Sequence, residues 1–186
     1  MHTIYNKSFH SNNKKQEISC PANLSVNPLF VTGLVDAEGC FMLFLRKTSE
    51  YKMGYQVQAI FKIALHKKDY KLLQIIQNFF GVGKITKHGD TTLQYTVKSL
   101  SDLQVIISHF DKYPLVSEKW GDYILFKQGI ELLKVKAHLN KEGFQKILSI
   151  KAVLNLGFNE DLNLEFPDIK AVKRPQASNK NPLDYN

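Results

Sequence analysis

Residues 31–39 read Val-Thr-Gly-Leu-Val-Asp-Ala-Glu-Gly, and this stretch decides the fold of the chain. Asn27 is a favourable helix N-cap, and Pro28 suits the first helical position. Glycine commonly ends a helix, and Gly39 follows the last residue of the apolar pattern. The sequence therefore predicts a helix over residues 28–37 that stops at Gly39.

Two carboxylates, Asp36 and Glu38, lie at the C-terminal end of this predicted helix. That end carries partial negative charge, so each carboxylate is unfavourable there by about a few tenths of a kcal/mol. Sequences that break a local rule in this way often do so at a functional site. The alternative is a core helix whose terminal carboxylates simply face water.

A narrow ridge on the predicted helix favours the functional interpretation. Gly33 and Ala37 are one turn apart and would let the backbone of a second helix approach closely, with Phe30 and Leu34 on an adjoining face. Two such helices packed together would place two Glu38-type carboxylates side by side. Like charges that close require a divalent cation between them.

Residues 31–39 resemble the LAGLIDADG motif of homing endonucleases, and the match is specific at Gly33, Leu34, Asp36, Ala37 and Gly39. Three further stretches, at residues 79–85, 102–115 and 124–128, resemble the fungal mitochondrial, intron-encoded members of that family. The resemblance covers about residues 27–175.

The resemblance implies a metal-dependent hydrolase that cuts a phosphodiester bond in each strand of double-stranded DNA. Glu38 falls at the acidic, metal-binding position of the family, where it would hold Mg2+ with a carboxylate from a second motif helix. Family members place basic groups near the scissile phosphates around Lys119, which makes Lys119 a candidate for charge stabilisation. A plain surface lysine is the alternative. Mitochondrial location follows from the subfamily resemblance.

Composition agrees with a nucleic-acid partner without proving it. The chain has 186 residues, with 25 Lys and Arg against 17 Asp and Glu and a net charge of +8, so it should bind polyanions. A hydrophobic content of 44% suffices for one sizeable core. No apolar run approaches ~18 residues, so no membrane span is predicted.

The order of predicted elements indicates an α+β fold. After the motif helix, periodicity predicts strands at about 41–46 and 55–66, a helix at 69–80, strands at 84–88 and 92–98, and a helix at 100–110. This αββαββα order gives a four-stranded antiparallel sheet with helices packed on one face, which is the half-unit of the LAGLIDADG fold. Two more helices are predicted near 117–137 and 141–155.

Polar side chains alternate along the predicted strands, on the face away from the core. Amides, hydroxyls and cations of this kind hydrogen-bond base edges or phosphates in DNA, although a solvated sheet face is the default explanation. The candidate DNA-binding residues are Arg46, Gln56, Gln58, Lys62, Lys84, Thr86, His88, Gln94, Thr96 and Lys98.

The chain carries one motif, whereas the chemistry needs two acidic helices. The sequence predicts a flexible leader at 1–26, an endonuclease domain at 27–157 and an inter-half linker at 158–186, as in the N-terminal half of a two-motif enzyme. The second half is either downstream in the same chain or a second copy in a homodimer. Three functions stay open: a nuclease, a maturase that binds its host intron RNA, and an inactive DNA-binding remnant.

Overall fold

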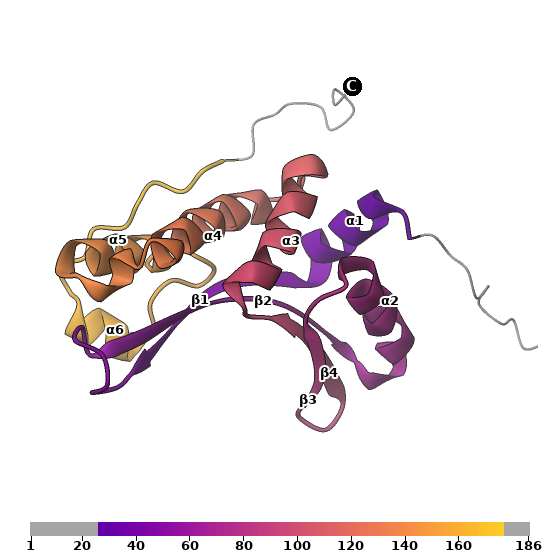
Figure 1. Ribbon diagram of the computed structural model, residues 1–186, viewed down its shortest axis with the longest axis horizontal. Coiled ribbons are helices and arrows are strands. Elements are labelled where there is room, and N and C mark those ends of the chain that lie inside the picture. Colours follow the sequence, from indigo (N-terminus) through magenta and orange to yellow (C-terminus); the bar gives the residue numbers. More distant parts are fainter. Residues whose placement is uncertain (1–25, 177–186) are drawn as a thin grey trace, which may run out of the picture.

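The computed structural model describes residues 26–176, so nearly all of the predicted leader and the last ten residues lie outside the described part. Figure 1 shows an arched sheet covered by helices on one side. The elements are α1 (Pro28–Glu38), β1 (Gly39–Lys47), β2 (Tyr55–His66), α2 (Tyr70–Phe80), β3 (Lys84–His88), β4 (Thr92–Val97), α3 (Leu100–Lys112), α4 (Lys119–Lys134), α5 (Lys141–Lys151) and α6 (Glu160–Glu165), with short 3-10 turns at Lys67–Asp69 and Ala137–Leu139.

Helix α1 begins at Pro28, as predicted, and ends at Glu38, one residue beyond the predicted range and directly before Gly39. The Asn27 side chain accepts a hydrogen bond from the Leu29 amide at 2.8 Å, and Pro28 is the first helical residue. Gly39 adopts extended backbone and starts β1 directly. A Cβ added at Gly39 would lie 2.7 Å from the Val35 carbonyl oxygen, so this tight passage from helix to strand requires glycine.

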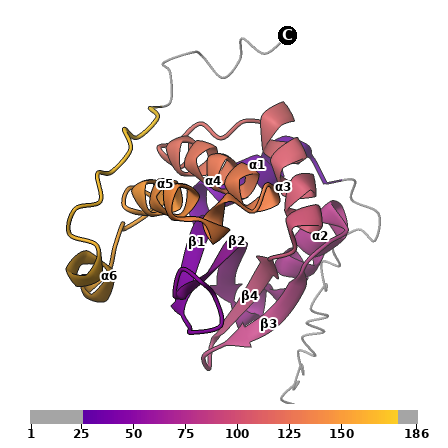
Figure 2. The same ribbon diagram turned by 60° about the vertical axis from the view of Figure 1, so that its left-hand side comes forward.

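The sheet has strand order β1-β2-β4-β3, and all neighbouring strands are antiparallel. Both ribbon views place the main helices on one side of this sheet and leave the concave side uncovered (Figures 1 and 2). The four-stranded antiparallel sheet with helices on one face, predicted from the alternating strands, is therefore confirmed. We call the uncovered side the open face.

Aromatic side chains fill the space between the sheet and the helices. The Phe41 ring centroid lies 5.3 Å from that of Phe61 and 5.6 Å from those of Phe110 and Tyr123. All four residues are almost completely buried. Burying such large side chains is the main stabilising contribution to this fold. Because Phe41 belongs to β1, this packing also fixes the position of the strand that directly follows Glu38.

The segment 158–176, which we call the tail, belongs to the stretch that the sequence predicted as an inter-half linker. It contains α6, which is capped by Asn159 and was missed because six residues are too few to show a helical period. Phe166 packs against Tyr55 and Phe144, at centroid distances of 5.7 and 6.0 Å. The tail thus forms part of the folded unit.

Beyond α6 the tail is fastened across the first turn of α4. Arg174 donates to the Asp122 carboxylate at 2.9 Å and to the Glu118 carbonyl at 3.0 Å. A Cβ added at Gly121 would lie 2.5 Å from the Pro175 carbonyl oxygen, so the two chain segments are in close contact.

Within residues 26–176 we find no helix with the length and apolarity that a bilayer crossing requires.

Candidate functional site

The two carboxylates at the end of α1 have different surroundings. Asp36 accepts hydrogen bonds from the amides of Val116 and Ser117, at 3.0 and 3.2 Å, and from the Ser117 hydroxyl at 2.6 Å. These bonds tie α1 to the loop that precedes α4. Asp36 therefore has a structural role, which leaves Glu38 as the candidate for chemistry at this helix end.

Glu38 is exposed, and its carboxylate makes no hydrogen bond or ion pair with any residue in the described part of the chain. Carboxylate oxygens are preferred ligands of divalent cations such as Mg2+. Among residues 26–176 no group of three or more His, Cys, Asp or Glu side chains could hold a metal. Glu38 is therefore a single candidate ligand, and its role in holding a metal ion stays a prediction.

Lys119 lies beside Glu38, at the first position of α4. Its ammonium group donates to the carbonyl of Gly39 at 2.5 Å and to that of Ala37 at 3.4 Å, on either side of Glu38. A cation at the C-terminal end of a helix is favourable, so Lys119 offsets the negative charge that gathers at the end of α1. Its role in catalysis stays a prediction.

Lys62 joins the same region through the sheet register. It pairs with Cys40, two residues after Glu38. Burial raises the pKa of the Cys40 thiol, and the charges of Lys62, Lys119 and Lys151 oppose that rise because they lie nearby. Cys40 thus stays a thiol at neutral pH, which argues against a nucleophilic role. The surroundings of Glu38 are basic.

The open face brings together the polar residues that the sequence singled out. Pairing Lys84 with Thr96 and Thr86 with Gln94 aligns the two hairpin strands side by side. Arg46 pairs with Gln56 at the far end of β1 and β2. Lys98 follows β4 and lines the same hollow as Lys84. All ten candidate residues therefore belong to one surface, while their contacts with DNA stay a prediction.

Sequence reasoning missed the apolar residues of the open face. Met42 pairs with Ile60, and Phe44 pairs with Gln58. Phe44 is 43% exposed on this face. The alternation Cys40, Met42, Phe44, Arg46 was the available signal. Apolar side chains at such positions can contact the methyl group of thymine.

The ridge of α1, which consists of Phe30, Gly33, Leu34 and Ala37, is largely uncovered. Phe30 is 51% exposed, Gly33 and Ala37 are exposed, and Leu34 is half-buried. A Cβ added at Gly33 would meet no atom within 4 Å. Leu29, 62% exposed, extends the ridge and was missed, although it is one turn before Gly33. This face can pack closely against a further helix.

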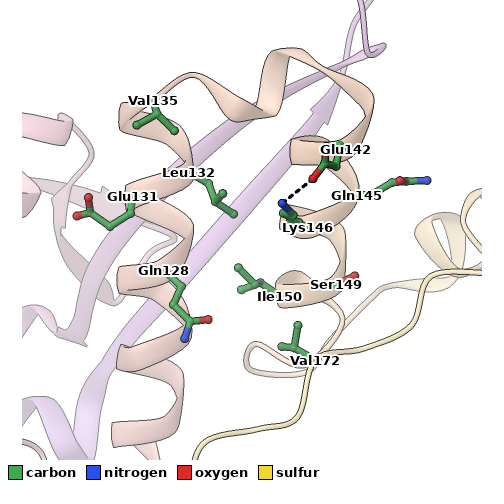
Figure 3. A pocket seen from close by; sticks show the side chains of 10 residues that line it. All are labelled: Gln128, Glu131, Leu132, Val135, Glu142, Gln145, Lys146, Ser149, Ile150 and Val172. Carbon is green, nitrogen blue, oxygen red and sulfur yellow. Dashed lines mark hydrogen bonds and ion pairs between the residues drawn. The ribbon is translucent and has the colours of Figure 1, made fainter.

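A separate groove of about 790 Å³ lies between α4 and α5 (Figure 3). Leu132, Val135 and Ile150 line it, and Val172 of the tail closes one end. At its rim Glu142 and Lys146 pair with each other at 2.7 Å. The groove belongs to the helix layer, away from Glu38 and the open face.

Known proteins similar to this chain are endonucleases or are encoded in introns. The family model for LAGLIDADG endonuclease matches residues 31–130. The probable intron-encoded endonuclease 2 of Neurospora crassa is 42% identical over 157 residues, which cover 83% of this chain and 35% of the relative. An uncharacterised 50.9 kDa protein in ND4 intron 1 of Podospora anserina is 61% identical over 119 residues, 63% of this chain and 26% of the relative.

The structure of I-SmaMI, bound to its uncleaved DNA target in the presence of calcium ions, superimposes on this chain with a TM-score of 0.82, and the two sequences are 45% identical. The match covers 86% of this chain and 55% of I-SmaMI. The chain thus spans about half of this solved structure, and between a quarter and about a third of the two curated relatives. The resemblance seen at residues 31–39 is confirmed, and the chain belongs to the LAGLIDADG endonuclease family.

Proposed function

We propose that this chain is one unit of a two-unit homing endonuclease that hydrolyses phosphodiester bonds in both strands of a DNA duplex with the help of a divalent metal ion. The observation that carries the proposal is the position of Glu38. This exposed carboxylate, which has no hydrogen-bond or ion-pair partner within residues 26–176, lies where the uncovered ridge of α1 meets the open face of the sheet.

The open face suits a DNA duplex because it combines positive charge with hydrogen-bonding groups. Phosphate contacts from lysines and arginines provide most of the affinity, and strand side chains that reach the grooves provide discrimination. Gln56, Gln58 and Gln94 carry amides of the kind that pair with adenine. The helices cover the other side of the sheet, so this face is the available one (Figure 2).

The chemistry at Glu38 needs a metal ion and a basic environment. A divalent cation, Mg2+ in this proposal, would lower the pKa of bound water and neutralise charge at the phosphate. Glu38 would hold it together with the matching carboxylate of the second unit. Lys119 and Lys62 place positive charge near the phosphate and stabilise the negative charge that develops there.

The second unit packs against the ridge of α1 in this proposal. The exposed Phe30 and the side-chain-free surface at Gly33 leave room for a second helix at close range. That helix comes either from a second copy of the chain or from another segment of a longer protein. The greater length of the relatives supports the second source. Relatives encoded in ND4 and cox1 introns support a mitochondrial, intron-encoded origin.

Selection and cleavage with the full chain test the proposal. Duplexes bound in Ca2+ would be selected from a randomised library, cloned as inverted repeats and incubated with Mg2+. We expect the parent chain to cut these duplexes and Glu38→Gln to bind them equally well without cutting. Glu142→Gln, which alters an exposed glutamate in the helix layer, is the matched control and should cut normally.

Two results would contradict the proposal. Cleavage by Glu38→Gln at the rate of the parent chain would show that Glu38 does not hold the metal ion. Failure to enrich any duplex, together with salt-dependent binding of intron RNA that Glu38→Gln leaves unchanged, would favour the maturase function instead.

A further inference from the structure

A hollow of about 760 Å³ lies at the outer edge of the sheet, beyond the residues around Glu38. We call it the edge hollow. Its lining consists of the turn 81–83, Thr86 and Thr96 on the two hairpin strands, and Lys84, Lys98, Ser99 and Asp102 around them. It lies where α2 passes into β3 and β4 passes into α3.

The turn at residues 81–83 shapes one wall of the edge hollow. Gly81 and Gly83 have φ angles of +68° and +82°, which favour glycine and let the chain reverse from α2 into β3. The Gln77 amide donates to the Gly83 carbonyl, and the Tyr95 hydroxyl donates to the Val82 carbonyl, each at 2.9 Å. Both carbonyl oxygens are therefore occupied, and the turn is held rigidly.

The charge of the lining favours an anion. Lys84 and Lys98 are exposed, and neither forms an ion pair with a residue in the described part of the chain. Asp102 is half-buried and supplies one negative charge, so the lining has a net charge of +1. Thr86 and Thr96 add hydroxyl donors. Unpaired ammonium groups beside hydroxyls are the usual protein partners of phosphate oxygens.

The sheet register relates the edge hollow to Glu38. Cys40, Lys62, Thr96 and Lys84 form one row across β1, β2, β4 and β3. Three strand spacings make this row about 14 Å long. The major groove of DNA is about 12 Å wide. A phosphate near Glu38 and a phosphate at Lys84 are therefore separated by about the width of one major groove.

We infer that the edge hollow holds a phosphate of the DNA backbone, across the major groove from the bond cut beside Glu38, and that it fixes the duplex without reading its sequence. The inference rests on the proposed function. It divides the candidate DNA-binding residues by role: Lys84 and Lys98 bind the backbone, whereas amide-bearing residues such as Gln58 and Gln94 face base edges.

Salt-dependent binding tests the division of roles. Lys84→Gln and Lys98→Gln, singly and together, would be measured on selected duplexes of several sequences at increasing KCl concentrations. A phosphate contact predicts a similar loss of affinity on every sequence and a salt slope smaller by about 1 for each lysine removed. Asp102→Asn should tighten binding, because it removes the negative charge from the lining.

Lys87→Gln is the matched control, since Lys87 is exposed on the same strand but projects from the opposite face of the sheet. It should leave the salt slope nearly unchanged. Circular dichroism and thermal unfolding would verify that each variant is folded.

The possible failures are distinguishable. If the parent chain binds no duplex at any salt concentration, the proposed function itself is wrong. If the parent binds but the double variant keeps the parent's slope, the edge hollow holds no phosphate and the proposed function stands. A change of preference at one base pair, with the slope unchanged, would show that these lysines read bases and would also overturn the inference.

Discussion

Asp36 and Glu38 show how two residues of the same chemistry, two positions apart, come to have different roles. In the sequence both break the same rule about helix ends. In the structure Asp36 accepts hydrogen bonds from Val116 and Ser117, about 80 residues away, whereas Glu38 makes no hydrogen bond or ion pair with the residues that the structure describes. No local pattern reveals partners so distant in the chain. The rule about helix ends could therefore mark the pair but not separate its members, and only the family resemblance singled out Glu38.

Asp36→Asn should destabilise the chain by about 1 to 3 kcal/mol, because the amides and hydroxyl of the α4 loop lose a charged acceptor. Glu38→Gln should change the free energy of unfolding by less than about 0.5 kcal/mol, as expected of an exposed side chain. Urea unfolding of both variants measures this difference. Equal effects would contradict the separate roles.

His109 is a buried histidine that connects α1 to α3. It is 8% exposed, and its Nε2 lies 3.2 Å from the Thr32 hydroxyl, which donates to the Tyr113 carbonyl at 3.0 Å. Burial lowers the pKa of His109 from 6.5 to about 4. Aromatic rings of Phe79, Phe80 and Phe110 surround it, so no neighbouring charge compensates protonation.

This burial predicts loss of stability in acid. The unfolded chain protonates His109 at a higher pH than the folded chain does, so its contribution is fully present above about pH 6.5 and declines as pH falls toward 4. Between pH 7 and pH 5 we expect a loss of about 2 kcal/mol. Denaturant unfolding at both pH values measures it. In His109→Gln the pH dependence should shrink by that amount; an unchanged dependence would contradict the assignment.

At the scale of elements, sequence periodicity predicted the bounds well where one face of an element is buried and the other is more polar. Strand β2 was predicted with the bounds it has, because Ala59, Phe61 and Ile63 alternate with more polar residues and are buried. Helix α4 is shorter than predicted and ends before Lys136, which has a φ of +54°. Side-chain pattern gives no sign of such a turn, since lysine fits a helix equally well.

The ridge of α1 gives an element-scale prediction with opposite effects on stability and assembly. Gly33→Ala should stabilise the isolated chain by up to about 1 kcal/mol, because alanine favours a helix and meets no atom here. The added methyl group should also prevent close packing of a second helix, and so weaken self-association and cleavage. Thermal unfolding, sedimentation and cleavage of an inverted repeat measure these three effects.

Ser108→Ala is the control for Gly33→Ala, since Ser108 is exposed on α3 and its hydroxyl bonds only to its own helix, at the Gln104 carbonyl. It should leave association unchanged. If Gly33→Ala associates and cuts as the parent does, the ridge is not the surface that meets the second unit.

At the scale of the whole molecule, one folded unit presents two uncovered surfaces, the ridge of α1 and the open face, and Glu38 lies at the junction of α1 and β1 between them. The αββαββα order and the polar residues of the open face could be predicted, since they follow from the periodicity of helices and the alternation along strands. The anchoring of the tail by Arg174 and Asp122 could not, because this pair joins residues 52 positions apart. The position of Glu38 beside the open face predicts that DNA lies on this face with the cut bond beside Glu38.

A DNA-cleaving iron chelate attached to Cys40 tests this placement of the DNA, because Cys40 is two residues from Glu38 at the start of β1. The reagent would be coupled in a Cys20→Ser background and would break the backbone of bound, selected DNA by hydroxyl radicals. A second attachment site, Arg46→Cys in a chain that also carries Cys40→Ser, lies about 20 Å farther along the same strand.

We predict that Cys40 attachment produces breaks at the position that the parent chain cuts in Mg2+, and that attachment at position 46 moves the breaks toward the outer end of the protected sequence. Breaks at the same positions from both sites, or breaks scattered along the duplex, would contradict the account.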